Sequence, residues 1–136
     1  MKKAFWLNDF WYNHRMKQII NKLAVIGSRT FEDYDYLRKT ILEHVDCEAL
    51  QTIISGGATG ADALAERFAA EFNLPTEIYP ADWKRYGRAA GPKRNTTIAK
   101  ACDGCIAFTI GPSPGTMDAI KKCRAQNKPV IHIPVE

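Results

Sequence analysis

Long apolar runs are missing from this sequence. No stretch approaches the roughly 20 consecutive apolar residues that a membrane-spanning helix needs, although 46% of the 136 residues are hydrophobic. The first residues, Met1-Lys2-Lys3, start as a secretory signal does, but Asn8 and Asp9 interrupt the apolar stretch that must follow. We therefore expect a cytoplasmic protein without a membrane partner.

Cysteine and histidine are scarce, with four and three residues respectively. Cys102 and Cys105 have the spacing of a metal-binding or redox pair, but no second ligand pair accompanies them to complete a zinc site. Asp103-Gly104 is typical of a turn between a helix and a strand, so we predict reduced, buried thiols. The histidines fall in three separate segments, and we expect no metal site and no cofactor.

Acidic residues are absent between positions 84 and 100, in a protein of net charge +4. The cations of this stretch are Lys84, Arg85, Arg88, Lys93, Arg94 and Lys100. They form either a solvated basic face or a surface that attracts anions.

Apolar periodicity predicts strands that alternate with helices. Strands are predicted over 22–26, 51–54, 76–79, 104–108 and 130–133, and helices over 33–45, 61–72, 92–101 and 117–126, with Thr116 as the cap of the last helix. The segment between about 80 and 91 is predicted to be irregular. Such alternation predicts one Rossmann-like, three-layer α/β domain over 22–136, with about five parallel strands and helices on both faces. We expect residues 1–21 to be an N-terminal extension, which holds five aromatic residues. It is either an amphipathic helix that packs on the domain or on a second copy of the chain, or a segment that precedes a natural start at Met16.

Glycine-bearing loops follow four of the predicted strands. Ligands of such folds bind outside the carboxyl ends of the strands. The candidate ligand-binding residues in these loops are Gly27, Ser28 and Arg29, then Gly56, Gly57, Ala58, Thr59, Gly60 and Asp62, then Asp82, Trp83, Arg88, Gly91, Arg94 and Asn95, and finally Gly111, Gly115 and Thr116.

The chemistry of these loops favours an anion. Glycines let backbone N–H groups approach a phosphate, and a helix start carries partial positive charge. Arg29, Arg88 and Arg94 would neutralise phosphate. Trp83 either faces a base or covers an apolar edge, and Asp62 either orients the loop or a ligand hydroxyl, or complements the helix dipole. The alternative is that the glycines only shape tight turns.

Four motifs together resemble the YspA family, the cpYpsA-related group of the SLOG superfamily. They are Gly27-Ser28-Arg29, the segment 55–62, Ala81-Asp82-Trp83 and the segment 90–95, and the likeness covers about residues 22–133. The superfamily includes LOG phosphoribohydrolases, the DNA-processing protein DprA and nucleotide-sensing domains of bacterial conflict systems. The resemblance implies a Rossmann-like fold that binds a nucleotide or a nucleotide-derived ligand as a sensor or binding module.

Two alternatives come from relatives within that superfamily. LOG enzymes carry Pro-Gly-Gly-x-Gly-Thr-x-x-Glu, and here Ala119 occupies the Glu position while Asp118 precedes it. One residue is a turn of about 100° on a helix, so Asp118 is a weakened candidate for the catalytic carboxylate of a nucleotide N-glycoside hydrolase. The segment 55–62 also resembles DprA, which implies single-stranded DNA binding with Trp83 as a stacking platform.

Overall fold

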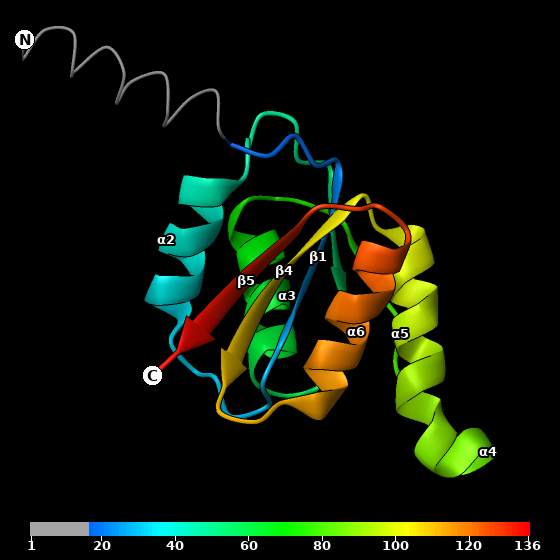
Figure 1. The fold of residues 1–136 in the computed structure, drawn as a ribbon. Helices are drawn as coiled ribbons and strands as arrows, with labels where there is room; N and C mark the ends of the chain where they lie inside the picture. The colour runs from blue at the N-terminus through cyan, green and yellow to red at the C-terminus, as the bar shows by residue number, and fades with distance from the viewer. Residues whose placement is uncertain (1–16) are drawn as a thin grey trace, which may run out of the picture.

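The computed structural model describes residues 17–136 and contains a five-stranded parallel sheet in the order β3-β2-β1-β4-β5 (Figure 1). The strands are β1 Lys22–Gly27, β2 Thr52–Ser55, β3 Thr76–Ile78, β4 Gly104–Ile110 and β5 Val130–Val135. Strands that follow one another in the chain are joined by helical crossovers, as a parallel sheet requires. The predicted Rossmann-like α/β fold is confirmed.

Helices cover both faces of the sheet (Figure 1). They are α2 Tyr34–His44, α3 Ala61–Glu71, α4 Trp83–Tyr86, the 3₁₀ turn η1 Gly87–Ala89, α5 Ala90–Ala101 and α6 Pro114–Ala125. Successive side chains of a strand point to opposite faces, so Leu23 and Val25 pack with α2 and α3. Ala24 and Ile26 pack in the second core with α5 and α6.

Three of the four cysteines lie in the second core. Cys102, Cys105 and Cys123 are buried and free, and the Sγ atoms of Cys102 and Cys123 lie 3.9 Å apart. The prediction that Cys102 and Cys105 are buried is confirmed.

Two differences from the prediction concern the loops around the cavity, whereas the other element boundaries shift by at most two or three residues. The segment predicted to be irregular folds into α4 and η1, where the Asp82 carboxylate accepts a hydrogen bond from the Arg85 N–H at 3.1 Å. Helix α6 begins at Pro114 with Ser113 at the N-cap, so the prediction of Thr116 as the cap is wrong. The reason is that the fixed φ of proline suits the first helical position.

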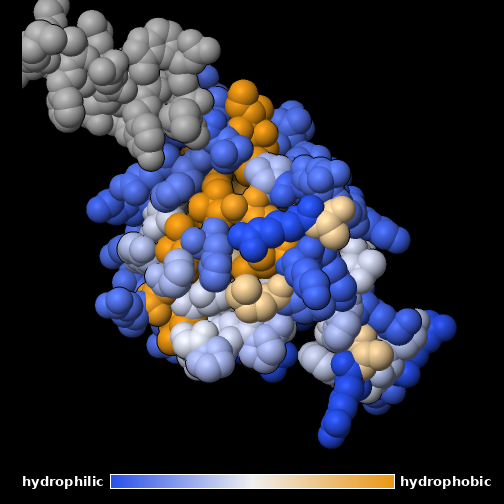
Figure 2. All heavy atoms as spheres, in the orientation of Figure 1, coloured by the Kyte–Doolittle hydropathy of each residue, from blue (hydrophilic) through white to orange (hydrophobic). Residues whose placement is uncertain are grey.

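The predicted extension over 1–21 falls mostly outside residues 17–136. Its last residues join the domain, because Gln18 forms a β-bridge with Val45 and the side chain of Ile20 is fully buried. Apolar residues gather over β5, which forms one edge of the sheet (Figure 2). Within the described part of the chain, no helix combines the length and the apolar character that a bilayer crossing demands.

Candidate functional site

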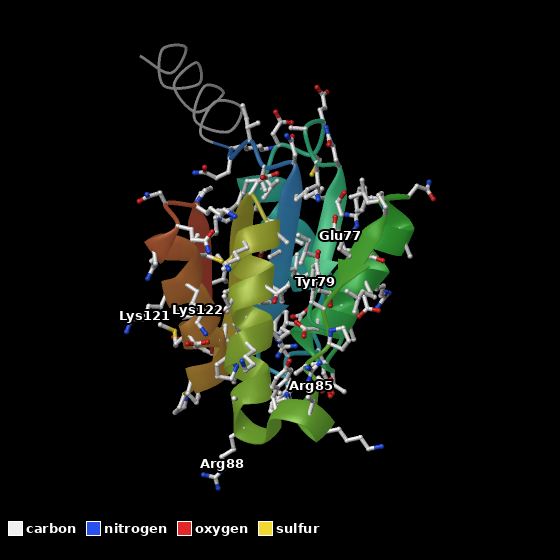
Figure 3. All side chains as sticks on the ribbon, turned by 90° about the vertical axis from the view of Figure 1, so that its right-hand side faces the viewer. Glu77, Tyr79, Arg85, Arg88, Lys121 and Lys122 are labelled. Atoms are coloured by element: carbon white, nitrogen blue, oxygen red, sulfur yellow. The ribbon has the colours of Figure 1, made fainter. Side chains whose placement is uncertain are left out.

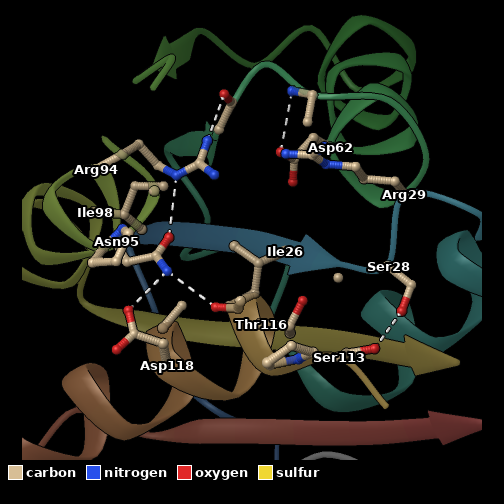
Figure 4. A pocket seen from close by; sticks show the side chains of 18 of the residues that line it. Ile26, Ser28, Arg29, Asp62, Arg94, Asn95, Ile98, Ser113, Thr116 and Asp118 are labelled. Carbon is tan, nitrogen blue, oxygen red and sulfur yellow. Dashed lines mark hydrogen bonds between the residues drawn. The ribbon is translucent and has the colours of Figure 1, made fainter. Parts of the chain in front are cut away.

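A cavity of about 660 Å³ opens at the carboxyl edge of the sheet. The loops after β1, β2 and β4 line it together with α5 and α6 (Figure 4). Its volume lies within the range of about 300–1,000 Å³ that is usual for small-molecule sites. Strands β1 and β4 are neighbours in the sheet. From β1 the strand order continues through β2 and β3 to one edge, and from β4 it continues to β5 at the other edge. Rossmann-like folds bind their ligands at such a switch point.

The floor of the cavity is apolar. Ile26 ends the buried part of β1, and Ile98 and Ala119 come from α5 and α6. The ring of Trp83 lies over Gly91, where a Cβ atom would meet it at 3.4 Å, and 51% of Trp83 is exposed. The Arg29 guanidinium lies 5.9 Å from the centre of that ring. A planar group can therefore rest on carbon atoms while polar groups surround it.

The start of α6 forms one wall of the cavity. Pro114 has no N–H, and no acceptor within residues 17–136 takes the N–H of Gly115 or Thr116. The Oγ atoms of Ser28 and Ser113 lie 2.8 Å apart, and Ser28 Oγ also accepts the N–H of Ile110 at 2.9 Å. These contacts hold the uncapped helix start against the end of β1.

Asn95 links this wall to α5. Its Nδ2 donates to the Gly115 carbonyl and to Asp118 Oδ2, both at 3.0 Å, while its Oδ1 accepts from Arg94 Nε at 3.1 Å. Asn95 is only 7% exposed. One amide therefore fixes Arg94, Asp118 and the first turn of α6 relative to one another.

Asp118 lines the cavity as an ionised carboxylate. Lys122 Nζ donates to its Oδ2 at 2.8 Å from one turn further along α6. Partial burial opposes ionisation, but the hydrogen bonds from Lys122 and Asn95 hold the pKa of Asp118 below its usual value. Sequence reasoning missed Lys122, although its i,i+4 spacing from Asp118 was a readable signal.

The turn after β2 forms the opposite wall, where Arg94, Asp62 and Arg29 lie side by side (Figure 4). Arg94 Nη1 donates to the Gly56 carbonyl at 2.9 Å. A Cβ atom on Gly56 would lie 2.4 Å from that nitrogen and 2.7 Å from Asp62 Oδ2. The absence of a side chain at Gly56 thus lets a guanidinium and a carboxylate approach the same turn.

Two N–H groups of this turn are already engaged. Gly57 donates to Ser55 Oγ at 3.1 Å, and Ala58 donates to Asp62 Oδ2 at 3.2 Å. A smaller cavity of about 250 Å³ adjoins the first and includes Gly57 in its lining. These two N–H groups are therefore not open to a ligand, in contrast to those of Gly115 and Thr116 at the start of α6.

Thr59 and Gly60 hold the loop after β1 and do not line either cavity. Thr59 Oγ1 lies 3.5 Å from the Arg29 carbonyl. Gly60 has a φ of 71°, and a Cβ atom there would lie 2.4 Å from the Ser28 carbonyl oxygen. These two residues position Arg29 by packing the start of α3 against its backbone.

Three further candidates lie away from the cavities. Asp82 caps α4, Gly111 turns the chain after β4 with a φ of 57°, and Arg88 is exposed and points away from the domain (Figure 3). The structure brings together the candidates Gly27, Ser28, Arg29, Gly56, Ala58, Asp62, Trp83, Gly91, Arg94, Asn95, Gly115, Thr116 and Asp118. Sequence reasoning missed the apolar lining at Ile26 and Ile98, which reads as ordinary core.

The parallel sheet and the glycine-lined cavity at its switch point define a Rossmann-like domain with a cavity at the carboxyl edge of the sheet. The chain belongs to the YspA, cpYpsA-related SLOG family, whose model matches residues 21–86, from the start of β1 to the end of α4. It is also 32% identical over 124 residues to the Gene 61 protein of Mycobacterium phage D29, a match that covers 83% of this chain and 96% of that protein. The comparison with solved structures gives no match.

Proposed function

We propose that the protein binds a nucleotide or a nucleotide-derived ligand, with a phosphate at the start of α6. The observation that carries this proposal is the pair of N–H groups at Gly115 and Thr116, which have no acceptor within residues 17–136 and lie in the wall of the cavity. Free N–H groups at a helix start bind phosphate oxygens, and the helix dipole adds attraction.

The rest of the cavity supplies the matching surface for a nucleotide. Within the described part of the chain, Arg29 forms no ion pair, and Arg94 donates hydrogen bonds to protein acceptors only from Nε and Nη1. Their remaining donors are available to phosphate oxygens. Ile26 and Ile98 offer carbon surface to a base or a sugar, and Trp83 offers an exposed ring on which a base can stack.

The experiment is a thermal-shift and calorimetry panel. It contains the four ribonucleoside 5′-monophosphates and 5′-diphosphates, ADP-ribose, an oligodeoxynucleotide and the matching nucleosides. A ligand at 100 times its dissociation constant adds about 2.7 kcal/mol to stability. We expect a clear shift with at least one nucleotide and a much smaller one with its nucleoside. Equal shifts for both would show that no phosphate site exists.

Hydrolysis of a nucleotide N-glycosidic bond is a second candidate, favoured by the ionised Asp118 in the cavity wall. That carboxylate would stabilise positive charge that develops on the ribose. Lys122 already neutralises it at 2.8 Å, so we expect binding without turnover. Release of free base that disappears in Asp118→Asn, with binding intact, would instead make the protein an enzyme.

Binding of single-stranded DNA is a third candidate, favoured by the exposed tip formed by α4 and η1. Trp83 and Tyr86 are 51% and 38% exposed, and Lys93 Nζ lies 4.7 Å from the centre of the Tyr86 ring. Aromatic rings and cations together bind unpaired bases. The oligodeoxynucleotide in the panel decides between this candidate and a mononucleotide ligand.

A further inference from the structure

Asp62 is a buried carboxylate with few partners. It stands in the first turn of α3, is 6% exposed and contributes to the lining of the cavity. A carboxylate offers about four acceptor sites. Within residues 17–136, Asp62 accepts one side-chain hydrogen bond, from the Ala58 N–H to Oδ2 at 3.2 Å, and Oδ1 accepts none.

No cation among residues 17–136 forms a salt bridge with Asp62. Arg94 of α5 and Arg29 of the loop after β1 face it and favour its charged form, while Glu66 on the next turn of α3 opposes it. Burial is the dominant influence and raises the pKa of Asp62 above its usual value. A buried, poorly paired carboxylate weakens the fold, and such groups normally acquire donors from a partner.

Within residues 17–136 no side-chain nitrogen or oxygen is both buried and without a partner, so Oδ1 of Asp62 is open to the cavity, where water or a ligand supplies its donors. Direct contact between a phosphate and the Asp62 carboxylate is unfavourable because like charges repel. If phosphate binds at the opposite wall, as the proposed function states, the part of the ligand that reaches Asp62 is the sugar or the base. Two adjacent hydroxyl groups match the two oxygens of a carboxylate, and one of those oxygens is fully free here.

Resting on the proposed function, we propose that Asp62 accepts hydrogen bonds from the vicinal hydroxyls of a ribose and makes the cavity selective for ribonucleotides over 2′-deoxyribonucleotides. Removal of the 2′-hydroxyl takes one donor away from this carboxylate, which otherwise has only the Ala58 N–H within residues 17–136. Hydrogen bonds to charged groups contribute enough that the affinity for the deoxy analogue should fall by about 10- to 100-fold. Base N–H groups are the competing source of donors.

The test is calorimetric titration of the unmodified protein with each ribonucleoside 5′-monophosphate and its 2′-deoxy counterpart, and with ribose 5-phosphate against 2-deoxyribose 5-phosphate. We expect the ribose form to bind at least 10-fold more tightly for the same base. Equal affinities would overturn the role of Asp62 and leave the proposed function standing. A preference that follows the base and ignores the sugar would also overturn it. No binding of any probe would overturn both.

Two variants connect the preference to Asp62. In Asp62→Asn the ribose preference should fall to less than about 3-fold, because a neutral amide accepts hydroxyl hydrogen bonds more weakly. Glu66→Gln is the matched control, one turn along α3 and outside the cavity lining, and it should keep the preference. Retention of the preference in Asp62→Asn would contradict the assignment.

The stability of Asp62→Asn without ligand separates this role from a purely structural one. Because the folded protein holds a proton on Asp62 more tightly than the unfolded chain does, the stability falls as pH rises from the usual aspartate pKa through the raised value. The asparagine removes that loss, so the variant should be at least as stable as the unmodified protein at pH 7. A less stable variant that keeps the ribose preference would show that Asp62 only holds the turn.

Discussion

Arg94 and Asn95 are consecutive residues of α5, and both reach the cavity. The side-chain amide of Asn95 accepts a hydrogen bond from Arg94 and donates hydrogen bonds to Gly115 and Asp118. Arg94 is held at Nε and Nη1 and keeps its other nitrogen available. At the scale of single residues, the site is therefore a set of side chains that fix one another before a ligand arrives, which lowers the entropy cost of binding.

Arg94→Ala should weaken nucleotide binding by about 10-fold or more, as expected for loss of a charge-assisted contact. The control is Lys100→Ala, because Lys100 is an exposed cation at the far end of the same helix. It should change affinity less than about 2-fold at moderate salt. Calorimetry of both variants checks this, and comparable losses would mean that a diffuse field attracts the ligand.

The cysteines give a second prediction at this scale. Cys47 is exposed, whereas Cys102, Cys105 and Cys123 are buried. The hydrogen bond with Cys123 and burial raise the pKa of the Cys102 thiol far above its usual value. A thiol-specific reagent such as Ellman's reagent should label one thiol per chain quickly and the remaining thiols only after unfolding. Fast labelling of a second thiol would contradict the buried arrangement.

Helices α2 and α3 are tied together on the face of the sheet opposite the α5 and α6 layer. The Tyr34 hydroxyl donates to Glu71 Oε1, and Arg38 Nε donates to Glu71 Oε2 at 2.8 Å. Arg67 lies over the Tyr34 ring at 3.9 Å. Burial and the hydrogen bond to Glu71 raise the pKa of Tyr34 to about 12. These contacts join the two elements far from the cavity.

Tyr34→Phe should lower the thermal midpoint by a few degrees, because it removes the hydrogen bond while keeping the ring. Tyr36→Phe is the control, since the Tyr36 hydroxyl has no hydrogen-bond partner within residues 17–136.

The pH dependence supplies the second readout for this pair. The neutral Tyr34 is favoured in the fold, so its contribution is complete below pH 10 and is lost as pH rises through about 12. Tyr34→Phe should lack that part of the alkaline loss of stability. Identical pH profiles for the variant and the unmodified protein would contradict this assignment.

For the whole molecule, the sequence was sufficient to predict the order of the main elements and the edge of the sheet at which the cavity lies. Helix α3 was predictable because its apolar residues recur with a strict helical period, and β1 and β4 because they are short, continuous apolar runs. The carboxyl ends of parallel strands meet at one edge, so the sequence alone groups Ser28, Gly56 and Gly115.

Contacts between distant segments could not be predicted in this way. The pairing of Ser28 with Ser113 and the triple role of Asn95 depend on side-chain directions that periodicity does not specify. Arg88 was grouped with the candidate site because it lies between Trp83 and Arg94 in the sequence. In the structure, however, its side chain extends from η1 away from the domain (Figure 3). Local patterns identify elements, whereas the site is completed by tertiary packing.

The most direct test of the central claim removes one backbone donor from the α6 start. Thr116→Pro deletes an N–H that no acceptor within residues 17–136 takes, and proline is tolerated in the first turn of a helix. Thr116→Ala keeps the N–H and removes the side chain. Titration calorimetry with the ribonucleoside 5′-monophosphate that gives the largest thermal shift should show a loss of about 10- to 100-fold for proline and little change for alanine. Equal affinities for the two variants would contradict a phosphate site at the start of α6.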